Sequence, residues 1–209
     1  MQDTIQVGIL KKTVLWRLPK KMNLESPLTY SHTLLAPVIQ SGDTVIDATV
    51  GNGHDTIFLA SQVGRTGHVL GFDIQPQALV ATKQQLVLTG LAPQTNLILA
   101  GHESLNDYLD ADQEITAATF NLGYLPGSDK TITTTSTTTV PAIAACLQHL
   151  RRGGIVSVMV YYGHPAGKSE KQAVLDYVSG LDQAAFQVLQ YQFINQVHEP
   201  PFLVAIQRR

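Results

Sequence analysis

The stretch TVIDATVGNGHD, residues 44–55, decides the fold of this chain. A short apolar run ends at Asp47, a turn containing Gly51 and Gly53 follows, and residues 56–60 have the composition of a helix start. Glycines let the backbone turn sharply and approach a ligand closely, and the first turn of a helix offers unpaired N–H groups. The stretch therefore predicts a strand, a tight ligand-binding turn and a helix N-terminus.

A second acidic residue stands at the end of the next predicted strand, residues 67–73. Asp73 follows the glycine turn by about 20 residues, the spacing at which a carboxylate accepts hydrogen bonds from the hydroxyls of a ribose. The glycine turn and this carboxylate together predict an adenosine-type cofactor.

Two classes of cofactor compete for this geometry. The nicotinamide fingerprint G-x-G-x-x-G needs a third glycine, and Thr56 occupies that position here. The carboxylates of Asp47 and Asp55 would repel a pyrophosphate, whereas they suit a cofactor with a positive sulfonium and an α-amino group. We therefore favour S-adenosylmethionine over a dinucleotide. A purely structural turn, in which Asp55 only caps the helix, is the remaining alternative.

The composition fits one globular domain. The chain has 209 residues, of which 44% are hydrophobic, enough for one well-buried core and few for two. The sequence has no apolar run of about 18 residues, as a membrane span would need. The lone Cys146 excludes an internal disulfide and a cysteine-based zinc site. We therefore expect a cytoplasmic protein without a metal, with Cys146 in its core.

Charge is unevenly distributed along the chain. The formal net charge is −2, but residues 1–21 hold five basic residues and one acidic residue, so the remaining chain has a net charge of −6. A broad phosphate-binding face is thus not expected, and any nucleic-acid contact must be local. We expect residues 1–21 to be a disordered leader outside a natural start at Met22, or else a basic arm that contacts RNA. Residues 22–209 are expected to form a single domain.

The rest of the chain alternates predicted strands and helices. Further strands are predicted at residues 96–100, 115–121 and 155–161, and an antiparallel pair at 187–194 and 202–207 closes the sheet. Helices are predicted at 28–40, 54–63, 75–88, 141–152 and 168–178, with Pro37 kinking or ending the first. This alternation predicts an α/β fold with a mostly parallel sheet covered by helices on both faces. The Thr-rich residues 133–139 are either part of a functional loop or a low-complexity linker.

Polar residues gather where the predicted parallel strands end. Asp47, Asp73, His102, Asn121 and Tyr162 all lie at or just beyond such ends, so one crevice can hold them all. Residues 121–124, NLGY, have the pattern of the Asn-Pro-Pro-Tyr signature of enzymes that methylate nitrogen. In that signature the Asn oxygen and the next carbonyl accept hydrogen bonds from an amine, and the Tyr ring stacks on the substrate base. The pattern favours methyl transfer to nitrogen.

Three longer strings carry a more specific resemblance. They are NLGYLPGSDKTITT at residues 121–134, YGHPAGK at 162–168, and YQFINQ with PPF at 191–196 and 200–202. With them, residues 28–207 resemble the bacterial YtqB/MnmM family. The resemblance implies a class I methyltransferase fold, a Rossmann-like sheet of seven strands that is mostly parallel with one antiparallel strand. It also implies S-adenosylmethionine as cofactor, a homodimer, and tRNA as partner. The methyl acceptor would be the amine of 5-aminomethyl-2-thiouridine at wobble position 34 in the anticodon stem-loop.

The predicted site has a cofactor part and a substrate part. We expect the cofactor to contact Asp47, Thr49, Gly51, Asn52, Gly53, His54, Asp55, Asp73, Ile74, Gln75, His102, Glu103 and Asn121. We expect the nucleoside and its RNA to contact Leu122, Gly123, Tyr124, Lys130, Tyr162 and Lys168, with Lys171 nearby. The predicted catalytic residues are Asn121, Tyr124, Asp129 and His164.

The identity of the proton acceptor stays open, as do other functions. Asp129, His164 and the Asn121 oxygen are candidates to take the proton of the substrate amine. His32, His68, His149 and His198 lack partners at metal-ligand spacing, and we expect them at the surface or in caps. Alternative functions are an rRNA or small-amine methyltransferase, a dinucleotide oxidoreductase, and a cofactor-binding module without catalysis.

Overall fold

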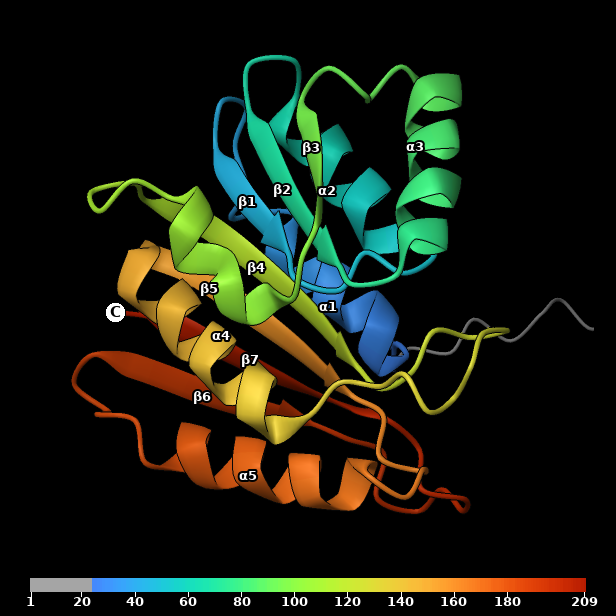
Figure 1. Ribbon diagram of the computed structural model, residues 1–209. Helices are drawn as coiled ribbons and strands as arrows, with labels where there is room; N and C mark the ends of the chain where they lie inside the picture. The colour runs from blue at the N-terminus through green and yellow to red at the C-terminus, as the bar shows by residue number, and fades with distance from the viewer. Residues whose placement is uncertain (1–23) are drawn as a thin grey trace, which may run out of the picture.

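A sheet of seven strands forms the centre of the molecule (Figure 1). The computed structural model describes residues 24–209, so the predictions for residues 1–21 and for Met22 lie outside the described part. The strands are β1 (Thr44–Asp47), β2 (His68–Asp73), β3 (Thr95–Leu99), β4 (Ile115–Leu122), β5 (Leu150–Val160), β6 (Phe186–Tyr191) and β7 (Phe202–Arg208), in the spatial order β3-β2-β1-β4-β5-β7-β6. Neighbours from β3 to β5 pair in parallel, and β7 runs antiparallel to both β5 and β6. The predicted seven-stranded sheet with one antiparallel strand is confirmed.

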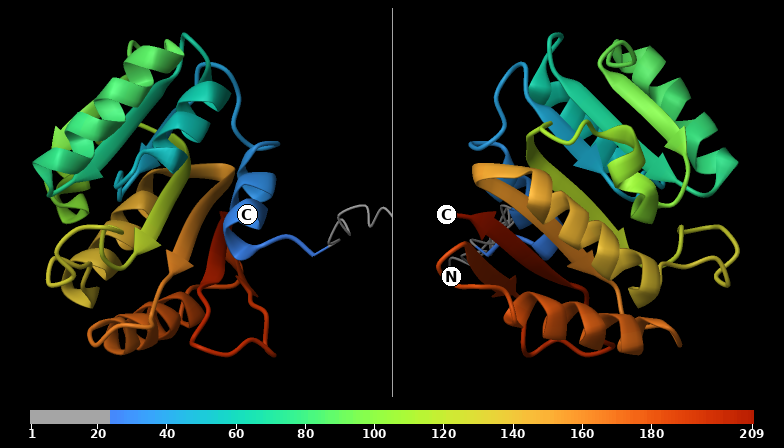
Figure 2. Two further views of the ribbon diagram at one scale, coloured as in Figure 1. Left: turned by 90° about the vertical axis from the view of Figure 1, so that its right-hand side faces the viewer. Right: turned by 60° about the vertical axis from the view of Figure 1, so that its left-hand side comes forward.

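Helices cover both faces of the sheet (Figures 1 and 2). On one face lie α1 (Pro27–Leu35), α2 (His54–Val63) and α3 (Pro76–Thr89), and on the other lie the short 3-10 helix η1 (His102–Tyr108), α4 (Ser136–His149) and α5 (Gly167–Ser179). Successive strand residues point to opposite faces. Val45 therefore packs with Leu35 and Leu59 on the α1–α2 side, while Ile46 packs on the α4 side.

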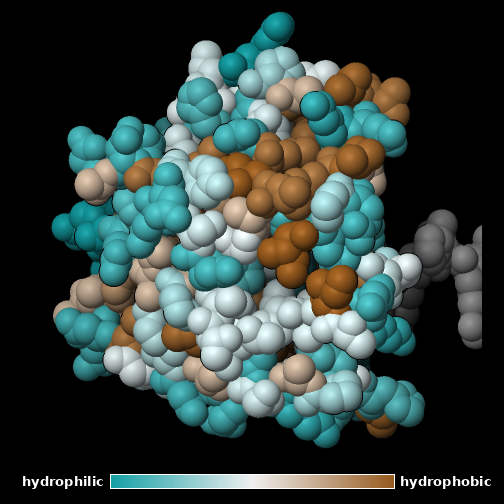
Figure 3. Space-filling model, viewed as in Figure 1, coloured by the Kyte–Doolittle hydropathy of each residue, from teal (hydrophilic) through white to brown (hydrophobic). Residues whose placement is uncertain are grey.

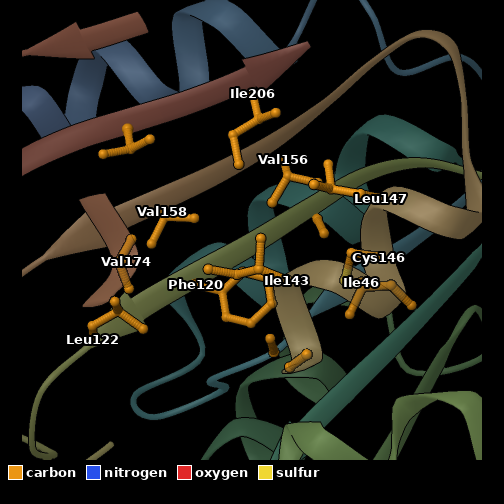
Figure 4. Close-up of a cluster of buried hydrophobic side chains, with 14 of the residues drawn as sticks. Ile46, Phe120, Leu122, Ile143, Cys146, Leu147, Val156, Val158, Val174 and Ile206 are labelled. Carbon is orange, nitrogen blue, oxygen red and sulfur yellow. The ribbon is translucent and has the colours of Figure 1, made fainter. Parts of the chain in front are cut away.

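The larger core lies between the sheet and the layer of α4 and α5 (Figure 4). Phe120 and Leu122 of β4 contribute to it, together with Ile143 and Cys146 of α4 and Val174 of α5. Cys146 is fully buried, as predicted, and this burial raises the pKa of its thiol. This core packs β4 against α4 and α5, so the loop that follows β4 starts from a buried strand.

Two helix boundaries differ from the prediction, and both concern proline. The first helix ends at Leu35 instead of residue 40, because Pro37 has no N–H with which to continue the helical hydrogen bonds. Helix α4 begins at Ser136, five residues before Pro141, so Pro141 lies inside the helix instead of opening it. Residues 136–139 are therefore the first turn of α4, and the interpretation of the Thr-rich run as a linker is wrong.

The end of α4 was also misplaced. The helix stops at His149 and β5 begins at Leu150, whereas the sequence predicted a helix to residue 152 and a strand from 155. Gly153 has a positive φ of 78°, and the pairing of β4 with β5 shifts register between Ile115 and Ala117. Gly153, just beyond the predicted end of that helix, instead lies near the start of a long strand.

Two surface features of residues 24–209 bear on function. Within this part of the chain, none of the helices combines the length and the apolar character that crossing a membrane requires. Apolar surface gathers on the right-hand side of the molecule, over β3 and α3 (Figure 3), where Val80, Val87, Leu88 and Leu99 are exposed. The sheet has β3 as one of its two edge strands.

Candidate active site

A cavity of about 580 Å³ opens at the carboxyl ends of β1, β2, β4 and β5. This is the edge at which ligands collect in open parallel sheets. In Figure 1 the loop that follows β4 projects beyond this edge. Most of the predicted site residues line the cavity: Thr49, Gly51, Asn52, His54, Asp55, Asp73, Ile74, Gln75, His102, Glu103, Asn121, Leu122, Gly123, Tyr124, Tyr162 and His164. Asp47, Gly53, Asp129, Lys130 and Lys168 do not line it.

The glycine turn is held in a conformation that other residues rarely adopt. Gly51 and Gly53 have φ values of 50° and 79°, and Gly53 caps the N-terminus of α2. A Cβ on Gly53 would lie 2.6 Å from Oγ1 of Thr82, so this position needs glycine for space as well as for φ. Gly53 therefore shapes the cavity from behind its wall, by letting α2 and α3 approach each other.

Asp73 ties the end of β2 to the glycine turn. Its Oδ2 accepts a hydrogen bond from the Gly51 amide at 2.8 Å, and its Oδ1 accepts one from the Gln75 amide at 2.8 Å. Each carboxylate oxygen has a second acceptor position. Asp73 lines the cavity and is half-buried, so these positions are available to a ligand with two hydroxyl groups.

Asp47 lies behind the cavity wall, which corrects the prediction that it faces a ligand. Its oxygens accept hydrogen bonds from Oγ1 of Thr56 at 2.6 Å and from the Thr49 amide at 3.2 Å. Complete burial, reinforced by the nearby Asp55 carboxylate, raises the pKa of Asp47 from 3.8 to about 7. Asp47 therefore supports the start of α2 from beneath and is not part of the cavity surface.

Asp55 is the carboxylate of the glycine stretch that does face the cavity. Its Oδ2 accepts a hydrogen bond from Nδ2 of Asn121 at 2.7 Å, and its Oδ1 accepts one from Nε2 of His32 at 2.7 Å. Because a carboxylate only accepts hydrogen bonds, the Asn121 nitrogen must point to Asp55. The Oδ1 atom of Asn121 is then the end of the amide left for a ligand.

His32, expected at the surface or in a cap, is half-buried and contacts the site through Asp55. It belongs to α1, and its ring stacks on Phe58 with centroids 3.9 Å apart and an angle of 4° between the planes. The stack fixes the ring plane, and the bond to Asp55 fixes its direction. The spacing of residues 32 and 55 does not predict this contact, because α1 and α2 come together only when both pack on the same face of the sheet.

The loop after β4 is anchored by a buried carboxylate that sequence reasoning also missed. The Gly123 amide donates to Oγ1 of Thr134 at 2.8 Å, and this hydroxyl donates to Oε2 of Glu170 at 2.8 Å. Oε1 of Glu170 accepts a hydrogen bond from Oγ1 of Thr139 at 2.7 Å. Glu170 is 2% exposed, so this chain of hydrogen bonds joins the loop, α4 and α5 away from water.

The carbonyl after Asn121 is already engaged. The Leu122 oxygen accepts a hydrogen bond from the Tyr161 amide at 3.1 Å, which continues the pairing of β4 with β5. The Asn-Pro-Pro-Tyr pattern would leave this carbonyl to the substrate amine. In this chain the Asn121 side chain and the neighbouring Asp55 are the oxygen acceptors at that point of the cavity.

His102 lines the cavity and has one ring nitrogen without a partner. Its Nδ1–H donates to the Ala48 carbonyl at 3.1 Å, and burial lowers the pKa of the ring, which favours its neutral form. In the neutral ring Nε2 carries a lone pair, and among residues 24–209 it has no hydrogen-bond partner although it is buried. A buried acceptor without a partner is costly, so this nitrogen suits a ligand N–H group.

Asp129 lies apart from the cavity, unlike the other predicted catalytic residues. It accepts hydrogen bonds from the amide and hydroxyl of Thr131, which lower its pKa, and its side chain is exposed. Tyr124 and His164 meet edge to face with centroids 5.7 Å apart, and both line the cavity. Asp129 thus shapes its own turn and is not brought to the reacting groups.

The three lysines predicted to contact RNA have different surroundings. Nζ of Lys130 lies 5.4 Å from the centre of the Tyr124 ring, and Lys168 forms a salt bridge with Glu199 at 2.9 Å. Nζ of Lys171 lies 4.0 Å from the centre of the Tyr162 ring, a cation–π contact that stabilises the fold. Each of the three lysines therefore contacts a residue of the cavity wall.

The cavity wall is acidic. Four carboxylates line it, from Asp55, Asp73, Glu103 and Glu199, whereas no lysine or arginine of the described range does so. Glu199, in the loop after β6, also lines the cavity, although its position in the sequence gives no sign of this. Residues 24–209 contain no cluster of three or more His, Cys, Asp or Glu side chains arranged to hold a metal ion. The cavity therefore favours a cationic ligand and disfavours a polyphosphate.

Known proteins with similar sequences and structures fit this picture. A chloroplastic tRNA (mnm5s2U34)-methyltransferase of Arabidopsis thaliana is 35% identical over 186 residues, which cover 85% of this chain and 68% of the relative. A crystal structure of a "putative rRNA-methylase" from Clostridium thermocellum has a TM-score of 0.87 and 42% identity, covering 90% of this chain and 100% of its own. A "putative methyltransferase" from Streptococcus mutans in complex with SAH has a TM-score of 0.81 and 42% identity, covering 89% and 99%. A family model matches residues 69–207, and the chain belongs to that family, described as "Putative rRNA methylase".

Proposed function

We propose that this chain transfers a methyl group from S-adenosylmethionine to the amine of 5-aminomethyl-2-thiouridine at wobble position 34 of tRNA. The products are 5-methylaminomethyl-2-thiouridine and S-adenosylhomocysteine. The proposal draws on the Arabidopsis relative, whose name states this position, and on the complex of the Streptococcus relative with SAH. The single observation that carries it is a cavity lined by four carboxylates, with the Asn121 oxygen directed into it.

The cavity fits the methyl donor. S-adenosylmethionine supplies, when bound, an electrophilic methyl group on a positively charged sulfur. The carboxylates stabilise its positive charges, while they would repel the pyrophosphate of a dinucleotide. Asp73 is the residue for the ribose hydroxyls, and Nε2 of His102 is the acceptor for an N–H of the adenine. Thr49, Gly51, Asn52, His54, Ile74, Gln75 and Glu103 complete the wall on this side.

The other side of the cavity suits an amine on a flat base. Oδ1 of Asn121 accepts a hydrogen bond from the amine and fixes its direction, because Nδ2 is held by Asp55. The Tyr124 ring lies beside it for stacking on the base, with His164 supporting the ring at its edge. Such a site accelerates methyl transfer chiefly by alignment of the two reacting atoms.

The RNA partner is the anticodon stem-loop. Lys130 and Lys168 are the proposed phosphate contacts, and Leu122, Gly123 and Tyr162 line the entry for the nucleoside. The described residues carry more acidic than basic side chains, so binding depends on these local contacts instead of a broad basic face. We place the enzyme in the cytoplasm, where its tRNA substrate is used.

We also propose a homodimer. The exposed apolar side chains of α3 and of the edge strand β3 support this state, because burial of such a surface against a second copy is favourable. Sedimentation equilibrium of the purified chain would give the mass directly. The mass of a single chain at micromolar concentration would contradict the proposal.

Methylation of defined RNAs tests the proposed function. The purified chain is incubated with S-adenosylmethionine and an anticodon stem-loop carrying 5-aminomethyl-2-thiouridine, and the nucleosides are identified by mass spectrometry. We expect a gain of one methyl group on that nucleoside and none on a matched stem-loop with plain uridine. Methyl transfer to an rRNA fragment with none to the stem-loop would overturn the proposal in favour of an rRNA methylase.

A further inference from the structure

The chemistry of an amine nucleophile demands a proton acceptor in this site. An alkylamine has a pKa of about 10 by analogy with lysine, so it is almost entirely protonated at neutral pH. The ammonium form has no lone pair with which to attack a methyl group. One proton must therefore leave the nitrogen before or during transfer, and a side chain within hydrogen-bond reach can accept it.

Two of the acceptors considered from the sequence do not fit this role. Asp129 is exposed and engaged with Thr131, outside the cavity. The amide oxygen of Asn121 is too weak a base to hold a proton at neutral pH. His164 lines the cavity, with Nε2–H donating to the Tyr161 carbonyl at 3.0 Å, and it remains as a rival.

Asp55 has the geometry that these groups lack. It lies in the first turn of α2, is 7% exposed and lines the cavity. Its Oδ2 atom is 2.7 Å from Nδ2 of Asn121, so this carboxylate oxygen lies next to the amide group that carries Oδ1. An ammonium group that donates one hydrogen bond to Oδ1 of Asn121 can direct a second N–H to the free lone pair of Oδ2. The Leu122 carbonyl, engaged by Tyr161, does not compete for it.

We propose that Asp55 takes the proton of the substrate ammonium, and that His32 is the positioning residue that aims the carboxylate. This inference rests on the proposed function. One N–H bond breaks and its proton passes to Oδ2 of Asp55, which leaves a lone pair on nitrogen. That pair forms the N–CH3 bond as the S–CH3 bond breaks, and the electrons of the broken bond stay on sulfur. The proton on Asp55 passes to solvent once the product has left.

His32 acts by its hydrogen bond and by its stacking. Nε2–H occupies Oδ1 of Asp55 at 2.7 Å, and the stack on Phe58 prevents the ring from turning. The carboxylate is therefore held from one side by α1 and from the other by Asn121. Other ionisable groups around Asp55 are Asp47 beneath it on β1 and Tyr161 after β5, with Asp73 across the cavity. None of these has a hydrogen bond to Oδ2 of Asp55.

The pH dependence of turnover separates this role from others. We would measure kcat on the anticodon stem-loop for the wild type and for Asp55→Asn, with both substrates saturating, between about pH 6.5 and 9.5. We expect Asp55→Asn to lose about 100-fold in kcat near pH 7, the usual range for a lost general base. The loss should shrink about tenfold per pH unit, because hydroxide then supplies the neutral amine. Binding of S-adenosylhomocysteine, measured by calorimetry, should stay unchanged.

The His32 variants complete the design. His32→Phe keeps the stack on Phe58 but removes the donor, so it should show a smaller loss with the same recovery at high pH. His32→Gln keeps an N–H group and should restore most of the rate. His149→Gln is the matched control, because His149 is a helical histidine that donates to the Gln113 carbonyl outside the site. If Asp55→Asn fails to fold, the pH profile of His32→Phe decides the question.

Three results would overturn the inference while leaving the proposed function intact. The first is an active Asp55→Asn variant with wild-type kcat at pH 7. The second is an equal loss at every pH together with weaker binding of S-adenosylhomocysteine, which would make Asp55 a cofactor ligand. The third is a pH-dependent loss in His164→Gln but not in Asp55→Asn. A wild-type chain that does not methylate the stem-loop would instead contradict the proposed function, and the inference with it.

Discussion

Two hydrogen bonds at Asp55 decide which atoms of the site are free to react. Because the carboxylate holds the nitrogen of Asn121, the amide oxygen points to the cavity without competition from a flipped rotamer. The same logic at Asp73 leaves two acceptor positions for a ligand after the Gly51 and Gln75 amides are satisfied. Single residues therefore divide the cavity into an amine side and a cofactor side.

Replacing one residue on each side tests this division. Asn121→Ala should cut kcat and leave the dissociation constant for S-adenosylhomocysteine unchanged. Asp73→Ala should weaken that binding by about tenfold or more, since one charge-assisted hydrogen bond contributes about 1.5–3 kcal/mol. Calorimetry and steady-state kinetics on both variants check the pattern. The reverse pattern would show that Asn121 serves the cofactor.

Asp47 leads to a prediction about stability. In the unfolded chain its carboxyl ionises with a pKa near 3.8, whereas burial keeps the pKa at about 7 in the folded chain. Between these two pKa values only the folded chain holds the proton, so the free energy of unfolding falls as pH rises from about 3.8 to about 7. Above pH 7 the full loss of stability is reached. Asp47→Asn has no carboxyl group to ionise, so its free energy of unfolding at pH 8 should exceed that of the wild type by on the order of 2–4 kcal/mol. Urea unfolding at pH 5 and pH 8 checks it: the gain should be larger at pH 8, and an equal difference at both would contradict the burial argument.

Most single residues of the site could be predicted, because strand ends can be found from the sequence. Asp73, His102 and Asn121 each follow an apolar run, Asp55 follows the glycine turn after β1, and parallel strands bring such positions together. Asp47 was misjudged because alternation along β1 and the start of α2 turn its side chain away from the cavity. His32 and Glu199 could not be predicted, since they reach the site from elements distant in sequence.

At the scale of elements, the turn between β1 and α2 depends on its contact with α3. Gly53→Ala and Gly90→Ala both place a Cβ on a residue with positive φ, which costs about 1–2 kcal/mol in each. At residue 90 nothing lies within 4 Å of the new atom, whereas at residue 53 it meets Thr82. Gly53→Ala should therefore be less stable than Gly90→Ala by about 1–3 kcal/mol. Equal unfolding midpoints for the two variants would contradict the proposed packing of α2 on α3.

The loop after β4 depends on α5 through Glu170. Glu170→Gln leaves one of the Thr134 and Thr139 hydroxyls without its acceptor and should destabilise the fold by on the order of 1–3 kcal/mol. The Thr134 hydroxyl accepts the hydrogen bond of the Gly123 amide in the substrate loop. We therefore also expect a higher KM for the stem-loop with unchanged binding of S-adenosylhomocysteine. Glu114→Gln is the control, as Glu114 is exposed. A Glu170→Gln variant that binds RNA like the wild type would show that the loop does not need this anchor.

Elements were predicted well where apolar periodicity and glycine or proline signals agree, as for α2, which matches its predicted range of 54–63. They were misplaced around α4, where threonines suggested a loop and Pro141 suggested a helix start. The threonines are helical there because Thr139 is buried against Glu170, a tertiary contact that outweighs local preference.

At the scale of the whole molecule, the fold and the site follow from one arrangement. The parallel strands β1, β2, β4 and β5 end at one edge, and α1, η1 and the loops after β4 and β6 close the space beyond it. The sequence predicted a mostly parallel sheet but not the order of its strands, because no local pattern indicates that β1 lies between β2 and β4. The acidic wall is likewise a property of the assembled molecule, since its four carboxylates come from four segments.

A structure of the chain with S-adenosylhomocysteine and an anticodon stem-loop carrying 5-aminomethyl-2-thiouridine would locate both reacting partners at once. We expect the ribose of the cofactor at Asp73. The substrate nitrogen should lie about 3 Å from Oδ1 of Asn121 and from Oδ2 of Asp55, the length of a hydrogen bond. A cofactor seated away from the Gly51 and Gly53 turn, or an amine bound outside the carboxylate-lined cavity, would contradict the proposed site and its chemistry.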